Sequence, residues 1–220
     1  FHTTIRLAYA IEGFKLDSGL KKEVERALAY YITAYRKGGL FERELSKDKG
    51  LEDMNKLIEN PKVKEIRKSN LSRGQKLKNL YNSEDFIREG FIIKGQEEDK
   101  VKGLLKILIP AFYNSNSIAV LHCITGLQAV VTLKDYFKDY ERALDVLTTT
   151  AIAHLLTQED LDISIVDTNI DKSWNEIIEE ASKSRNVHTL KIAYTSEKLD
   201  KIFNVPELKY AVNFRIEEER

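Results

Sequence analysis

Apolar side chains recur at helical spacing along most of the chain, and no segment shows the strict alternation of a half-buried strand. The region after Gly19 is typical, because Ser18 is a good N-cap and the pair Gly38-Gly39 ends the pattern. One stripe of that region carries Leu20, Val24, Ala27, Leu28, Tyr31 and Tyr35. The pattern predicts long helices over residues 2–15, 18–36, 97–113, 116–135, 139–156, 171–183, 186–203 and 206–218.

The periodicity weakens between residues 41 and 94, where charges are dense and glycines interrupt the pattern. Short helices are expected there, near residues 51–59, 75–81 and 83–92. No internal repeat of solenoid length is present. The chain is therefore predicted to be all-α, a single domain over residues 1–220 with about eight to ten helices and no sheet.

Capping and proline signals refine three of these helices. Pro110 should kink or end helix 97–113, since proline lacks the backbone N–H that an interior helical residue donates. Asp171 and Ser173 can cap helix 171–183, and Pro206 suits the first turn of helix 206–218.

Composition narrows the classes of protein. The 35 basic residues balance 35 acidic residues, so the chain lacks the basic excess of a nucleic-acid or membrane-surface binder. The single cysteine, Cys123, excludes a disulfide framework and a cysteine-built zinc site. The apolar stretch 118–133 is shorter than the roughly 20 residues of a bilayer span. We expect a cytoplasmic protein without membrane or nucleic-acid partners, in which Tyr30, Tyr31 and Tyr35 line either the core or the interface of a homo-oligomer.

Several motifs of catalytic chemistry are absent from the sequence. There is no GxGxxG after a strand and no GxxxxGK[ST]. The sequence therefore has neither the glycine-rich turn of a dinucleotide-binding fold nor the P-loop that binds nucleotide phosphates. HExxH and CxxC are missing, and no glutamate precedes a histidine by three residues, as a di-iron helix bundle requires. Three imidazoles, from His2, His122 and His188, are still enough to bind a metal ion, although no metal ligand is assigned.

Histidines provide the main functional signal. In residues 118–130, His122, Thr125 and Gly126 share one helical face. Glycine costs a helix interior about 1 kcal/mol relative to alanine. Gly126 therefore indicates close approach by another helix or by a ligand. A histidine satisfied within the core is the alternative for His122.

The second histidine segment pairs a base with a cation. His188 and Lys191 lie one turn apart and could bind an anionic or phenolic group and move its proton. The alternative is an amphipathic helix whose lysine extends to water. His2 shares a helical face with Tyr9, whereas His154 is best explained by its charge near a helix C-terminus.

These segments, in this order, resemble the questin oxidase-like family. The family pattern H-x-x-I-x-L-x-Y-A-x-E matches the segment from His2 to Glu12, and H-x-[IV]-T-[GS]-x-x-A matches the segment from His122 to Ala129. A third family stretch, D-E-H-x-x-K-[LI]-A, is similar to this chain at His188, Lys191, Ile192 and Ala193. The chain starts with Phe1, and the resemblance implies that the family's N-terminal helices lie outside it.

The resemblance implies an NADPH-dependent oxygenase of Baeyer–Villiger type that acts on an aromatic or quinone-like small molecule. It implies His122 and His188 as acid/base groups and Lys191 as the stabiliser of developing negative charge. His2, Tyr9, Thr125 and Gly126 would then contact the substrate. A non-catalytic helical ligand-binding or scaffold protein is the alternative, because Asn186 and Val187 replace the acidic residues of the third motif and residues 40–95 match poorly.

Overall fold

The computed structural model describes residues 1–35, 40, 48–83, 90–164 and 170–219. These residues form eleven α-helices and two 3-10 turns, with no strand beyond one isolated bridge between Asp48 and Ile92. The all-α prediction is confirmed, and the number of helices is slightly higher than expected. The α-helices are α1 (His2–Leu16), α2 (Lys21–Ala34), α3 (Leu51–Glu59), α4 (Pro61–Lys68), α5 (Arg73–Asn82), α6 (Glu97–Ser115), α7 (Ile118–Thr132), α8 (Tyr140–Leu155), α9 (Trp174–Ser182), α10 (Val187–Phe203) and α11 (Leu208–Glu217).

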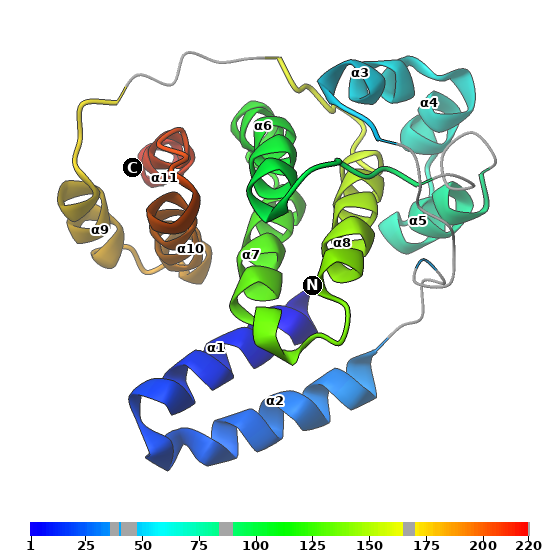
Figure 1. Ribbon diagram of the computed structural model, residues 1–220. Helices are drawn as coiled ribbons and strands as arrows, with labels where there is room; N and C mark the ends of the chain where they lie inside the picture. The colour runs from blue at the N-terminus through cyan, green and yellow to red at the C-terminus, as the bar shows by residue number, and fades with distance from the viewer. Residues whose placement is uncertain (36–39, 41–47, 84–89, 165–169, 220) are drawn as a thin grey trace.

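Helix α7 lies at the centre of the molecule. It packs against α1, α6, α8 and α10, and almost every side chain along it is buried. In Figure 1, α9, α10 and α11 lie on one side of α6, α7 and α8, with α3, α4 and α5 on the other, while α1 and α2 form a hairpin across one end. The apolar stretch 118–133 is thus explained as a core helix, which is why it lacks a polar face.

Helix α6 contains a proline in its interior. The helix continues through Pro110 to Ser115, so of the two expected effects, a kink or an end, the end is excluded. Pro110 removes one intrahelical hydrogen bond, but Ile109, Ala111 and Phe112 around it are buried. Burial of these side chains offsets the missing bond, since each large apolar side chain contributes about 2 kcal/mol when buried.

The middle of the chain holds one helix that the sequence pattern missed. Helix α4 starts at Pro61, and the Asn60 side chain accepts hydrogen bonds from the next two backbone amides. In the sequence, the pair Asn60-Pro61 is typical of a turn. In the structure, Asn60 is the N-cap of α4 and Pro61 is the first residue of that helix. The expected helices 51–59 and 75–81 are present as α3 and as part of α5.

The expected helix 83–92 lies mostly outside the described residues. Its last part is not helical, because Gly90 has a positive φ and Ile92 makes the isolated bridge. Phe91 is held instead by the buried Thr149 hydroxyl, which accepts a hydrogen bond from the Phe91 N–H (3.0 Å) and donates one to the Phe91 carbonyl (2.9 Å). These two hydrogen bonds hold the backbone of Phe91 against α8.

The helix caps confirm one prediction and correct two. Ser173 and Glu176 form a capping box at the start of α9, as the sequence indicates. Asp17, rather than Ser18, caps the turn before α2, and its carboxylate accepts from the Gly19 N–H. Pro206 precedes α11 by two residues and so lies outside its first turn.

Helix α2 packs mainly on α1, and most of its apolar side chains stay exposed. Ala27 is its one fully buried residue, while Leu28, Tyr30 and Tyr35 are exposed. The tyrosines therefore do not fill the core. No helix among the described residues combines the length and the apolar character that a membrane crossing demands.

Candidate functional site

Three histidines from three helices meet at one place. His2 is the first residue of α1, His122 lies in α7 and His188 is the second residue of α10. The Nε2 atoms of His2 and His122 are 2.9 Å apart, which is hydrogen-bonding distance. The rings of His122 and His188 meet edge to face with centroids 5.5 Å apart. The structure thus brings together the three histidines that the sequence singled out.

The packing of α1 and α10 on α7 produces this convergence. Ile5, Ala8 and Ile11 of α1 form a small apolar cluster with Ala129 of α7 and Leu133. Helix α10 contacts the same central helix through its own buried face, which includes Ile192. Since both outer helices begin near His122, their first-turn histidines lie beside it.

The three imidazoles are held in their neutral form. The pKa of His122 is lowered to about 4, chiefly by burial and further by the neighbouring His2, His188 and Lys191, which all act in the same direction. Burial also lowers the pKa of His2 and of His188, with the Lys191 ammonium acting in the same direction on both. Neutral imidazoles at pH 7 can accept a proton, which is the property a general base needs.

Lys191 connects the histidines to a groove between α1 and α10. Its charge influences the pKa of each histidine, and its side chain lines the groove. The groove has a volume of about 310 Å³ and is lined by Tyr9, Glu12, Gly13, Leu16, Val187, Leu190, Lys191 and Tyr194. Lys191 makes no ion pair with any described residue, so its ammonium is available to a ligand.

Tyr9 lines the groove. Its hydroxyl is 3.5 Å from the Thr195 hydroxyl, and burial raises the pKa of Tyr9. Its ring meets the Tyr194 ring edge to face, with centroids 5.8 Å apart. Tyr9 is therefore a neutral hydroxyl on an aromatic wall of the groove.

Thr125 and Gly126 lie beneath the surface instead of lining the groove. Thr125 is fully buried, and its hydroxyl donates to the His122 carbonyl at 3.4 Å. A Cβ on Gly126 would lie 2.5 Å from Cδ1 of Phe1, so the group that approaches this glycine is the Phe1 ring. The sequence left open whether another helix or a ligand approaches Gly126. Among the described residues, Phe1 at the start of α1 makes this close approach.

His154 does not act as a charged partner of the helix dipole. Burial lowers the pKa of His154 to about 4, and the ring packs against Phe1 with centroids 4.9 Å apart. A neutral ring has no charge to offer the C-terminus of α8, so that sequence expectation is wrong. Burial also raises the pKa of the Cys123 thiol to about 12, which leaves it unreactive as a nucleophile.

Glu12 is a site residue that the sequence analysis did not assign. Its carboxylate accepts hydrogen bonds from the Tyr194 hydroxyl (2.9 Å) and the Thr132 hydroxyl (3.2 Å) and pairs with the Lys198 ammonium. It therefore links α1, α7 and α10 along the floor of the groove. A glutamate three residues after Tyr9, on the side of α1 that carries buried residues, was the signal available in the sequence.

The residues of the histidine cluster and of the groove give little support for a bound metal ion or a dinucleotide cofactor. Among the described residues, no group of three His, Cys, Asp or Glu side chains is arranged to hold a metal ion. A phosphorylated dinucleotide carries several negative charges, whereas the groove offers the single cation Lys191 beside the carboxylate of Glu12. The groove residues do not fit NADPH.

Comparison with known proteins adds no relative. No family model, no curated protein and no solved structure matches the chain. The resemblance to the questin oxidase-like family stays a prediction from the three histidine motifs.

Proposed function

We propose that the protein is an oxidoreductase of the oxygenase class, similar to questin oxidase, that acts on an aromatic or quinone-like small molecule in the groove between α1 and α10. One observation carries the proposal: His2, His122 and His188 come together from three helices beside the free ammonium of Lys191. The three neutral imidazoles can accept a proton, and Lys191 joins them to a groove whose wall carries Tyr9 and Tyr194, which suits a planar phenolic substrate.

The chemistry that these residues can perform is proton transfer with charge stabilisation. His188 makes no side-chain hydrogen bond with a described residue and is only half-buried, so its free ring nitrogen can take the proton of a substrate hydroxyl. The O–H bond of the substrate breaks, an N–H bond forms on the imidazole, and the negative charge remains on the phenolate oxygen. The Lys191 ammonium, one turn away, stabilises that charge. An electron-rich phenolate ring is the form of such a substrate that reacts with oxygen.

His122 and His2 extend this proton path. The Nε2 atoms of His2 and His122 share one hydrogen bond, so a proton can pass from one imidazole to the other. His2 is exposed, so a proton that reaches the pair can pass to water. NADPH, implied by the resemblance, stays part of the proposal as an external reductant, and no step is derived through it.

The proposal is tested with 1,8-dihydroxyanthraquinone as the probe. Titration of the protein should produce a saturable phenolate band in the visible spectrum, and oxygen uptake should follow when NADPH is added in air. Lys191→Met should remove the phenolate band, and His188→Gln should lower the rate of oxygen uptake at least about tenfold. Lys201→Met, an exposed change on the same helix, is the matched control and should behave as the parent protein. Absence of any saturable spectral change would exclude the proposed substrate class.

A non-catalytic ligand-binding protein is the second candidate. The observation that favours it is the position of Thr125 and Gly126, which are closed off from the groove by burial and by Phe1. A substrate in the groove would lack these two contacts. A saturable phenolate band without oxygen uptake, with NADPH present, would select this second function over the first.

A further inference from the structure

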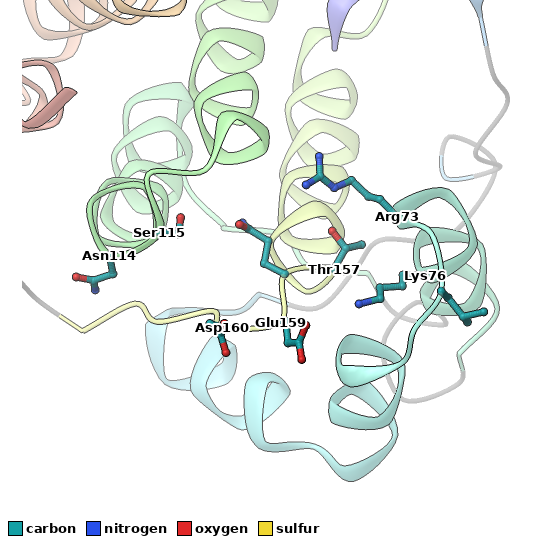
Figure 2. A pocket seen from close by; sticks show the side chains of 9 residues that line it. Arg73, Lys76, Asn114, Ser115, Thr157, Glu159 and Asp160 are labelled. Carbon is teal, nitrogen blue, oxygen red and sulfur yellow. The ribbon is translucent and has the colours of Figure 1, made fainter. Parts of the chain in front are cut away.

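A second pocket is polar and lies apart from the histidines. It has a volume of about 590 Å³, within the range of small-molecule sites. Its lining comes from the start of α5, the end of α6 and the segment that follows α8, and comprises Leu71, Arg73, Lys76, Asn114, Ser115, Thr157, Gln158, Glu159 and Asp160 (Figure 2). None of these residues belongs to the histidine cluster or to the α1–α10 groove, so this pocket is independent of the proposed oxygenase function.

Two cations on α5 face this pocket without a carboxylate partner. Lys76 is buried, and its ammonium donates to the Arg67 carbonyl at 2.5 Å but makes no ion pair with a described residue. Arg73 makes neither a hydrogen bond nor an ion pair with a described residue. Figure 2 shows Arg73 projecting from α5 toward α8, and Lys76 projecting toward the segment that follows α8. A buried ammonium is nearly always paired, so Lys76 indicates a missing anion.

An unpartnered donor supports the same conclusion. The Gln158 side-chain nitrogen is buried and has no hydrogen-bond partner among the described residues. Such groups in native proteins are rare and call for a ligand or a water. The first turn of α5, capped by Ser72, contributes its positive dipole end on the same side as Arg73. One side of the pocket is therefore rich in donors and positive charge.

The pocket lining also carries negative charge. Glu159 and Asp160 line the pocket, are exposed and make no ion pair with a described residue. They lie more than 4 Å from the two cations, because no salt bridge joins the two sets. A simple anion bound near Arg73 and Lys76 would also be repelled by these carboxylates. A ligand with a carboxylate at one end and an ammonium at the other satisfies both sets of charges.

We propose that this pocket binds a small zwitterion of the amino-acid class. Its carboxylate accepts hydrogen bonds from Arg73, Lys76 and the Gln158 amide, and its ammonium pairs with Glu159 and Asp160. Charge-assisted bonds of this kind are about twice as strong as neutral ones, and the pocket supplies them at both ends of the ligand. The arrangement sets a separation between the two charges and so selects the length of the ligand.

The test uses the whole chain and a series of ω-amino acids of increasing length: glycine, β-alanine, 4-aminobutanoate and 6-aminohexanoate. Calorimetric titration should show that at least one member saturates with a Kd at or below about 1 mM, and at least about tenfold tighter than acetate or methylammonium. Acetate or inorganic phosphate binding as tightly as the best amino acid would overturn the zwitterion assignment. Failure of every member to saturate by about 10 mM would overturn the site.

Variants locate the binding. Arg73 and Glu159 are exposed, so Arg73→Gln and Glu159→Gln should fold and each should weaken the best ligand by about tenfold. Lys78→Gln, an exposed change on α5 outside the pocket, is the matched control and should leave the affinity unchanged. Equal affinity in Arg73→Gln and the parent protein would show that the ligand binds elsewhere and would contradict the proposal.

Discussion

His2 and His122 share one hydrogen bond although 120 positions separate them in the sequence. When both rings are neutral, one Nε2 donates and the other accepts, so the two imidazoles are in different tautomers. The bond fastens the first turn of α1 to the central helix. It also places an exposed ring in contact with a half-buried one, which is a route for protons between the groove and water.

Acid should destabilise the protein through its neutral histidines. The pKa of His122 and of His154 is about 4 in the folded chain, below the ordinary value of 6.5. Between these values the unfolded chain binds more protons than the folded chain, so the free energy of unfolding falls as the pH drops from about 6.5 to about 4. Above about 6.5 the two histidines have no effect on the slope. Urea denaturation between pH 4 and 7.5 measures this dependence.

The variant His154→Phe isolates the contribution of one ring. It keeps the aromatic contact with Phe1 and removes the titrating group. Between pH 7 and pH 4.5 it should lose about 2 kcal/mol less stability than the parent protein. Parallel stability curves for the two proteins would show that His154 is not held neutral by burial.

The contact of Phe1 with Gly126 predicts a destabilising substitution. In Gly126→Ala, the new Cβ would lie 2.5 Å from Cδ1 and 3.1 Å from Cε1 of the Phe1 ring, so the ring must move. We expect a net loss of about 1–2 kcal/mol in the free energy of unfolding, because overpacking exceeds the gain of about 1 kcal/mol in helix propensity. Chemical denaturation of the two proteins measures the difference.

Two further proteins make this result specific. Gly74→Ala, a helical position with nothing within 4 Å of the new Cβ, should raise stability by about 0.5–1 kcal/mol. The double variant Phe1→Ala/Gly126→Ala should be more stable than the two single losses added together predict. Strict additivity would mean that Phe1 does not cover Gly126 in solution.

The Thr149 hydroxyl should stabilise the fold more than its intrahelical neighbours do. Thr149→Val keeps the shape of the side chain but leaves the buried N–H and carbonyl of Phe91 without partners. A loss of about 2–4 kcal/mol is expected, since each unsatisfied buried group costs about 1–3 kcal/mol. Thr148→Val is the matched control, because that hydroxyl donates only to the Leu144 carbonyl of its own helix and should cost less than about 1 kcal/mol. Similar losses for both variants would exclude the fastening role of Thr149.

A capping signal helped the sequence pattern to locate some helices. Helix α9 is an example, because Ser173 and Glu176 form the capping box that the spacing indicates. Helix α4 escaped detection because it is short and buries only Val63 and Arg67, which leaves almost no apolar stripe. Its capping residue, Asn60, also follows α3 directly, so the pair Asn60-Pro61 indicates a turn after α3 and not the start of a new helix.

The functional residues also divide into those that the sequence pattern could identify and those that depend on how the helices pack. The sequence could single out His2, His122 and His188, because each stands on a helical face, but their convergence depends on how α1 and α10 pack on α7. The cover of Phe1 over Gly126 could not be predicted, since it depends on how α1 crosses α7. The polar pocket was equally hidden, because Lys76 and Glu159 come together only through the packing of α5 beside the end of α8.

Removal of the Lys191 charge should raise the pKa of three histidines at once. The ammonium lowers the pKa of His2, His122 and His188, so in Lys191→Met each imidazole should titrate at a higher pH than in the parent protein. NMR titration of the histidine ring protons gives each value separately. Lys201→Met removes a charge from the same helix at an exposed position, paired with Glu197, and should leave the three values in place. A shift confined to His188 would show that Lys191 acts only on its own helix, and then the groove and the histidine pair would not form one site.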